Sequence, residues 1–298
     1  MQKDGRFGFL ILLGAAFFYA TYGIFSKLIA GTFPLFFQAW TRGAISLVCF
    51  AIFGMAKKLF VPINKKDIKW FLIVSIIGSL AIAPIFYSLA YLNLGTALFI
   101  QYAATVITSY ILGVLLLKEK LTGISYITFF LAIFGLLLVY WGDISLNKPL
   151  PVIASFIGGA FFSIYFVVSK KISQYSSIQI NTLAYIFAVV INLFISMILR
   201  EGYNFNFNST AWASNIGYGV AGFLGSGLTI YGFKYIDANK GSIVLLTEIL
   251  FGILFGMFLF KEYLGPVAIL GGFFIILSII LPNAAFFKYK SSNGQRSI

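Results

Sequence analysis

Ten apolar runs, each of roughly 20 residues, follow one another through almost the whole chain. A bilayer core about 30 Å thick is crossed by about 20 apolar residues of α-helix, so every run has the length of a transmembrane span. Backbone groups in lipid must bond to one another, and the runs lack the alternating polarity of membrane β-strands, so we expect helices. The sequence predicts an all-α integral membrane protein with spans at residues 8–29, 35–56, 70–91, 95–117, 122–141, 151–169, 179–199, 212–233, 241–260 and 265–283.

The composition excludes a water-soluble protein. The chain is 60% hydrophobic and 10% charged, whereas about a quarter of the residues in soluble domains are charged. The first run follows Lys3 and Arg6, as in a signal peptide, but it is long enough to span and lacks a small-residue cleavage site. We therefore expect it to remain as an uncleaved first helix.

Positive charges are distributed unequally between the two sides of the predicted bundle. The net charge is +13. With the N-terminus placed in the cytoplasm, 16 of the 21 lysines and arginines fall in cytoplasmic segments, four fall on the other side, and Arg42 lies within a span. This bias follows the positive-inside rule, so we expect a multi-pass protein of the inner (plasma) membrane with both termini cytoplasmic. The lysines form short clusters rather than one basic stripe, so nucleic acid is not an expected partner.

The two halves of the chain resemble each other. Residues 115–121 (LLLKEKL) match residues 258–264 (FLFKEYL) at an offset of 143, and the Ala-Phe-Phe triplet at residues 16–18 recurs at residues 160–162. Each half holds five spans, an odd number, so the halves enter the membrane in opposite directions, which is typical of secondary transporters. We expect two inverted five-helix repeats, at residues 1–145 and 146–285, and a cytoplasmic basic tail at residues 286–298.

Three features resemble the EamA-type branch of the drug/metabolite transporter superfamily. They are the paired five-helix arrangement, the Lys-Glu-(Lys/Tyr)-Leu sequence closing the fourth and ninth spans, and Arg42 early in the second span after Pro34. The resemblance covers residues 7–283. It implies transport without implying a substrate, because the family carries amino acids, sugars, nucleosides, amines and drugs. Val106 and Ile249 stand where the family often has a proline, a departure that leaves open whether either span is kinked.

Two charged side chains lie deep within the predicted spans. Of the eight acidic residues, Glu248 alone is mid-span, where a carboxylate is costly and usually faces a cavity or a partner. It would bind a proton or an amine cation, or else anchor two helices through hydrogen bonds. Arg42 would recognise a substrate carboxylate or pair with Glu248, or else extend toward the outer headgroups.

Polar and aromatic side chains supply further candidates. Gln101 and Thr105 share one helical face with the hydroxyl side chains at residues 108–109, and this face would line a substrate path or join two helices. Tyr87 and Tyr231 match at an offset of 144, and each is followed four residues later by another tyrosine. They would stack on an aromatic or cationic substrate, or lie at the membrane interface as tyrosines commonly do.

The chain lacks the side chains that most membrane enzymes use. It has no histidine and one cysteine, Cys49, and its aspartates lie at span edges, in loops or in the N-terminal tail. We therefore expect no catalysis, no metal site and no cofactor. Residues 217–222 formally match G-x-G-x-x-G, but a nucleotide-binding loop needs a preceding strand, so these glycines indicate helix packing.

These features predict a secondary transporter. On the family resemblance we expect an exporter of a small metabolite that works by alternating access around Glu248, embedded in the lipid bilayer, with protons as one option for the coupling ion. A flippase-like carrier of a lipid or lipid-linked molecule on the same scaffold is the alternative. A channel is a third possibility, against which the inverted repeat argues.

Overall fold

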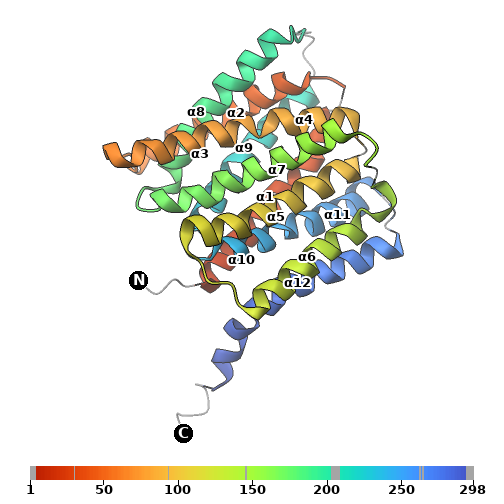
Figure 1. Cartoon of the computed structure of the whole chain (residues 1–298). Coiled ribbons are helices and arrows are strands. Elements are labelled where there is room, and N and C mark those ends of the chain that lie inside the picture. Colours follow the sequence, from red (N-terminus) through yellow and green to blue (C-terminus); the bar gives the residue numbers. More distant parts are fainter. Residues whose placement is uncertain are drawn as a thin grey trace.

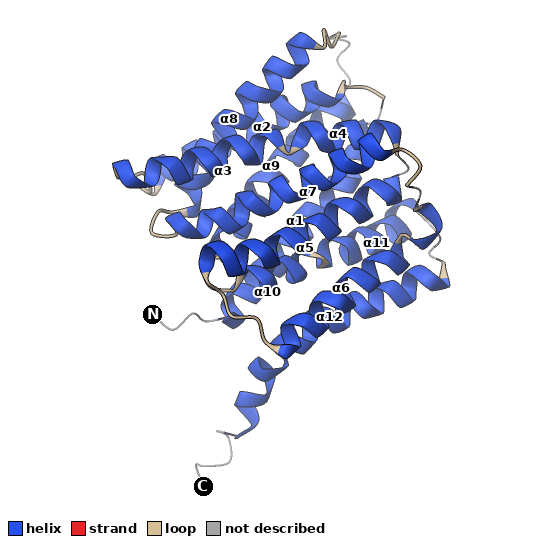
Figure 2. Ribbon diagram, in the orientation of Figure 1, coloured by secondary structure: helices blue, strands red, loops and turns tan. Residues whose placement is uncertain are grey.

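Helices account for nearly all of the structure, a computed structural model that describes residues 5–29, 31–92, 94–144, 146–202, 209–261, 263 and 265–292, with the backbone alone at residues 143 and 283–292. Over these residues there is no strand, which confirms the all-α prediction (Figure 2). Short 3-10 turns lie at Lys65–Asp67, Trp141–Asp143 and Lys170–Ile172. The α-helices are α1 (Gly5–Ile29), α2 (Leu35–Ala56), α3 (Ile68–Leu80), α4 (Ile82–Tyr91), α5 (Leu94–Leu117), α6 (Gly123–Val139), α7 (Pro149–Ser169), α8 (Ser177–Ile198), α9 (Ser209–Gly232), α10 (Ala238–Leu245), α11 (Thr247–Phe260) and α12 (Pro266–Ser292).

Each predicted span coincides with one helix or with two consecutive helices. Seven segments of the described chain are long and apolar enough to cross a membrane: α1, α2, α5, α8, the stretch containing α3 and α4, the stretch containing α7, and the stretch containing α10 and α11. The apolar parts of α6 and α12 are shorter, and the glycine-rich α9 is not among the seven. Membrane crossing by α6, α9 and α12 therefore stays a prediction.

The third span is interrupted because of Pro84. Proline has no N–H for the carbonyl four residues earlier, and its ring collides with that carbonyl. The carbonyl in question belongs to Leu80, which is the last residue of α3. The chain turns at Ala81 and resumes as α4, so the kink follows directly from the sequence.

The ninth span is interrupted as well, without the proline that the family often has there. Helix α10 ends at Leu245 and α11 begins at Thr247 although Ile249 is not a proline. The N–H of Leu246 bonds to the carbonyl of Ile243, and that of Ile249 bonds to the carbonyl of Leu246, which are tight three-residue steps. The break places Glu248 in the first turn of a new helix.

The last helix is longer than expected. The predicted span ends at residue 283, but α12 continues through Pro282 to Ser292. The first part of the predicted tail, residues 286–292, is therefore helical backbone. The remainder of that tail, residues 293–298, lies outside the described residues.

Helices from the two halves of the chain pack against one another throughout the bundle (Figure 1). Helix α1 packs on α9 and α11, α2 on α8 and α9, α5 on α7, and α6 on α12. We call the end at which α1 begins the basic end, because lysines follow the helices that finish there, including Lys57, Lys118 and Lys170. The other end is the opposite end.

Glycines permit the closest of these contacts. A Cβ at Gly135 of α6 would lie 2.8 Å from the carbonyl oxygen of Gly271 of α12, and a Cβ at Gly271 would lie 2.7 Å from that of Gly135. Between α5 and α7, a Cβ at Gly159 would overlap the carbonyl oxygen of Gln101. Small residues allow such backbone approach between helices in lipid.

Replacing Gly159 by alanine tests this packing. The added methyl group meets a backbone carbonyl that cannot rotate away, so we expect Gly159→Ala to destabilise the protein by about 1–3 kcal/mol through overpacking. The measurement is the thermal midpoint in detergent. Gly252→Ala is the matched control, because nothing lies within 4 Å of a Cβ there and alanine favours helix. Equal midpoints for the two variants would contradict the proposed contact.

Candidate functional site

Glu248 lies deep in the helix bundle, in the first turn of α11. Its side chain is half-buried. The hydroxyl of Tyr102 on α5 is its hydrogen-bonding neighbour, and Tyr19 on α1 lies within electrostatic range. The carboxylate, on a helix of the second half, therefore faces two helices of the first half.

Arg42 also faces inward. Its guanidinium carbon lies 4.2 Å from the ring centre of Tyr218 on α9 and 5.7 Å from that of Tyr22 on α1. Among the described residues no ion pair joins Arg42 to Glu248, so that interpretation of the two charges is not supported. Rings are the partners of this cation.

Tyrosines connect the two charged residues. The ring centres of Tyr19 and Tyr22 are 5.4 Å apart, and those of Tyr22 and Tyr218 are 4.3 Å apart. Tyr218 lies within electrostatic range of Tyr102, and Tyr22 lies within range of Tyr185 on α8. We call these five residues the tyrosine cluster: Tyr19, Tyr22, Tyr102, Tyr185 and Tyr218.

The tyrosine cluster was not singled out as a unit from the sequence. Its members are mid-span tyrosines, whereas tyrosines of membrane proteins usually gather at the interfaces. That depth is the signal that would have separated them from the tyrosines near span ends. Four of the five are half-buried although each lies between helices, and the fifth, Tyr218, is buried.

Hydroxyl groups converge beside Gly222 of α9. A Cβ at that position would meet Ser46 Oγ at 2.8 Å, Tyr22 Oη at 3.0 Å and Tyr185 Oη at 3.3 Å. Ser46 donates to the Gly219 carbonyl at 2.6 Å, and Tyr185 donates to the Gly222 carbonyl at 3.3 Å. The glycines at residues 217–222 thus pack α9 closely against α1, α2 and α8, as expected for a packing motif.

The predicted polar face of the fourth span is partly used between helices. The Thr105 hydroxyl lies 2.8 Å from the Gln101 carbonyl and 3.0 Å from the Gly159 carbonyl of α7. This contact favours the helix-joining interpretation for Thr105. Gln101 is half-buried and immediately precedes Tyr102, the member of the tyrosine cluster on α5.

Tyr87 and Tyr231 lie on the outside of the bundle, apart from Glu248 and Arg42. Tyr87 is 39% exposed and borders a shallow apolar hollow between α4 and α7. Tyr231 is 37% exposed, packs near Phe7 and accepts a hydrogen bond from Tyr235. Both positions match the interfacial interpretation better than the stacking one.

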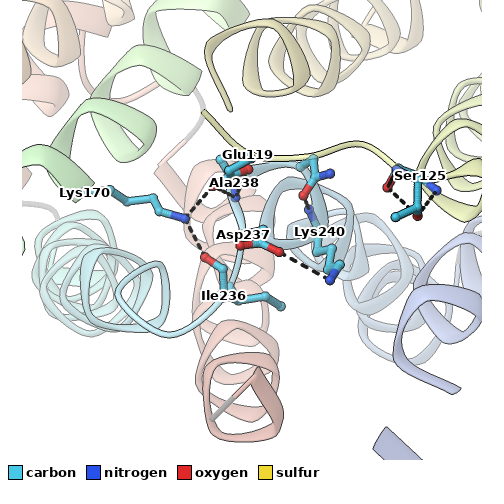
Figure 3. A network of polar contacts seen from close by, with 9 residues as sticks. Glu119, Ser125, Lys170, Ile236, Asp237, Ala238 and Lys240 are labelled. Carbon is cyan, nitrogen blue, oxygen red and sulfur yellow. Dashed lines mark hydrogen bonds and ion pairs between the residues drawn. The ribbon is translucent and has the colours of Figure 1, made fainter. Parts of the chain in front are cut away.

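A buried ion pair joins the two halves at the basic end (Figure 3). The Lys170 ammonium lies 2.8 Å from Glu119 Oε1 and donates to the Ile236 carbonyl at 2.7 Å. The two paired side chains are only 7% and 8% exposed. Both Glu119 oxygens accept from the N–H of Ala238, the first residue of α10, at 2.8 and 2.9 Å. A carboxylate is stabilised at a helix start by its free N–H groups. We call this arrangement the Glu119 contact.

A second set of polar contacts lies at the same end. The Tyr175 hydroxyl donates to Asp67 at 2.8 Å and accepts from the N–H of Asn64 at 3.0 Å. The Tyr175 carbonyl accepts from the Lys234 ammonium at 2.5 Å. Burial lowers the pKa of Lys234. Together with the Glu119 contact, these bonds link segments of the two halves at the basic end.

The opposite end carries a related arrangement around Glu201. Its Oε1 accepts from the N–H of Phe36 at 3.0 Å, and its Oε2 accepts from the N–H of Phe37 at 2.7 Å, both in the first turn of α2. Glu201 and Glu119 each follow a residue with a left-handed backbone, Arg200 (φ 50°) and Lys118 (φ 56°). That conformation is uncommon outside glycine and ends the helix abruptly. We call this arrangement the Glu201 contact.

Comparisons with known proteins agree with this architecture. The family model of the EamA-like transporter family matches the chain twice, over residues 6–141 and 149–283. Uncharacterized transporters from two strains of Helicobacter pylori are 25% and 24% identical over 291 residues, which cover 94% of this chain and 96% of each relative. An uncharacterized membrane protein of Saccharomyces cerevisiae is 21% identical over 225 residues, which cover 68% of this chain and 54% of that protein.

A solved crystal structure shares the fold. It superposes with a TM-score of 0.80 at 13% sequence identity, covering 94% of this chain and 97% of the other. At that identity the likeness concerns the fold alone. The matches of the family model carry the assignment, because together they span most of both halves. The chain therefore belongs to the EamA-like transporter family of the drug/metabolite transporter superfamily and is a multi-pass membrane protein.

Proposed function

We propose that this protein is a secondary transporter that exports a small metabolite across the inner membrane by alternating access. Its solute site is the space bordered by the tyrosine cluster, Arg42 and Glu248. The observation that carries the proposal is the inward placement of one cation and one carboxylate among half-buried tyrosines, between helices of both halves. Charged groups inside spans are costly unless they face a cavity or a solute.

Two inverted five-helix halves provide the moving parts, with both termini in the cytoplasm. The two consecutive matches of the family model support this division. So do the left-handed residues that end corresponding helices in the two halves, Lys118 and Lys261, at an offset of 143. In such transporters the halves rock around a fixed midplane site.

The Glu119 and Glu201 contacts are the two gates of this cycle. Each links the end of a helix in one half to the start of a helix in the other half. Access from the basic end requires the Glu119 contact to open, and access from the opposite end requires the Glu201 contact to open. The two would therefore open in alternation.

Glu248 is the coupling residue of the proposal. It has one hydrogen-bonding neighbour, Tyr102, and lies at the break between α10 and α11, where a small change in helix direction would alter its surroundings. Proton binding there would couple a pH gradient to the orientation of the site. Protons are thus the proposed coupling ion.

Glu248→Gln tests the coupling. The amide preserves size and hydrogen bonding but cannot exchange a proton, so we expect loss of pH-driven accumulation while solute exchange at equal pH persists. The measurement is uptake and counterflow in proteoliposomes with a panel of organic acids, amino acids, amines and nucleosides, with and without a pH gradient. Asp237→Asn is the matched control, because that carboxylate is exposed in a surface ion pair with Lys240. Full pH dependence in Glu248→Gln would overturn the coupling role.

Glu119→Gln tests the gate at the basic end. Breaking a buried ion pair costs about 3–5 kcal/mol, so this variant should favour the state that is open at that end. Ser226→Cys in a Cys49→Ala background reports access, through its rate of labelling by an impermeant maleimide added from the basic side. We expect labelling at least about tenfold faster, since 1.4 kcal/mol already corresponds to a factor of ten. Asp237→Asn again serves as the control. An unchanged rate would contradict the gate.

A further inference from the structure

We propose that Arg42 binds the carboxylate group of the transported solute, so that the cargo is a singly charged organic acid. This inference rests on the proposed function, because it names the solute class of the same site. It starts from what surrounds the guanidinium, and it excludes amines and phosphate esters as the main cargo.

The guanidinium has no polar partner of its own. It carries five N–H donors. Within the described residues, no carboxylate lies within ion-pair distance of it and no oxygen accepts a hydrogen bond from its side chain. The contacts that it makes are with the faces of Tyr218 and Tyr22. Arg42 is half-buried, so these donors are accessible to an acceptor that arrives from outside the chain.

The direction of the side chain argues against extension toward the headgroups. An arginine that reaches for the membrane surface points along its helix toward water. Arg42 instead contacts rings on α1 and α9, two members of the tyrosine cluster. The cation is thereby held among the rings of the tyrosine cluster. A guanidinium edge matches a carboxylate through two parallel N–H···O bonds.

The charge balance selects a monoanion. Among the described residues that face the tyrosine cluster, Arg42 is the one cation. A phosphate ester carries about −1.5 to −2 charges at neutral pH, so it would leave negative charge unpaired in a medium of low polarity. With Glu248 in its protonated form, a carboxylate is neutralised by Arg42 alone. Three hydroxyls converge one turn of α9 away at Gly222, those of Ser46, Tyr22 and Tyr185. The O–H groups of Ser46 and Tyr185 bond to carbonyls of α9, so their oxygens can accept from a further polar group of the solute, and Tyr22 can donate to it.

The test uses four probes that share one ring and differ in charge: benzoate, benzamide, benzylamine and phenyl phosphate. Each is added at millimolar concentration to the purified protein in detergent, and the thermal midpoint is followed. We expect benzoate alone to raise the midpoint in a saturable manner. In Arg42→Gln the apparent affinity for benzoate should fall at least about tenfold, since truncating one partner of a charged hydrogen-bonded pair costs more than 1.4 kcal/mol.

Matched variants separate binding from folding. Lys27→Gln removes another cation that lies over a ring, 4.3 Å from the centre of Phe260, but on the exposed side of α1; it should leave benzoate binding unchanged. Tyr218→Phe keeps the ring beneath Arg42 and should preserve binding, whereas Tyr218→Leu removes that ring and should weaken it. The two Tyr218 variants test whether Arg42 binds the carboxylate even if Arg42→Gln is too unstable to purify.

The outcomes distinguish this inference from the proposed function. Equal stabilisation by benzamide or benzylamine, no stabilisation by benzoate, or undiminished benzoate binding in Arg42→Gln would each overturn the carboxylate site. If proteoliposomes exchanged amines in that case, the proposed transport function would stand although the carboxylate site was rejected. Arg42-dependent binding of benzoate without exchange of any organic acid would retain the site and count against transport.

Discussion

Helices in lipid gain little from burying apolar side chains against one another, because the lipid tails are equally apolar. This bundle is held instead by close approach of backbones and by hydrogen bonds at the points of closest approach. Gly135 and Gly271 bring α6 against α12, and Gly159 brings α5 and α7 together. Hydroxyl side chains reach carbonyls of the neighbouring helix at such crossings, as with Thr105 and Ser46. The rest of the architecture depends on these contacts.

The same constraint places the candidate site. The glycines of α9 let α1, α2 and α8 approach closely enough for their hydroxyls to meet at Gly222. The tyrosine rings and Arg42 lie between the same helices. Close packing and the candidate site are therefore two aspects of one arrangement of small and large residues along α9.

Some of this could be predicted from the sequence, because hydropathy and single residues act locally. The helix positions followed from the apolar runs, and the break before α4 followed from Pro84. The depth of Glu248 could also be read from its place in a run. The rotation of each helix about its axis could not be predicted, because the runs are apolar on every side. For this reason the sequence indicates Tyr87 and Tyr231 as candidate site residues although they lie outside the bundle. It does not indicate Tyr22 and Tyr218, which lie inside.

Other features depend on partners distant in the sequence. The break between α10 and α11 at Leu246 could not be predicted from a proline, because the surrounding span contains none. The sequence around Glu119, residues 115–121, can be recognised as a motif because it recurs at residues 258–264. The role proposed for it requires the start of a helix 119 residues away, whose approach follows from the fold and not from the motif.

The choice of backbone N–H groups as partners of Glu119 and Glu201 has an evolutionary consequence. A side chain that binds main-chain groups places no demand on the identity of the residue that receives it. Ala238, Phe36 and Phe37 could therefore drift among most amino acids while the contact persists, and proline alone would remove the donor. Compensating pairs of substitutions would not be expected at these positions. A search for co-varying residues would pass over these backbone contacts, although they join the two halves of the molecule, and would detect at most the ion pair of Glu119 with Lys170.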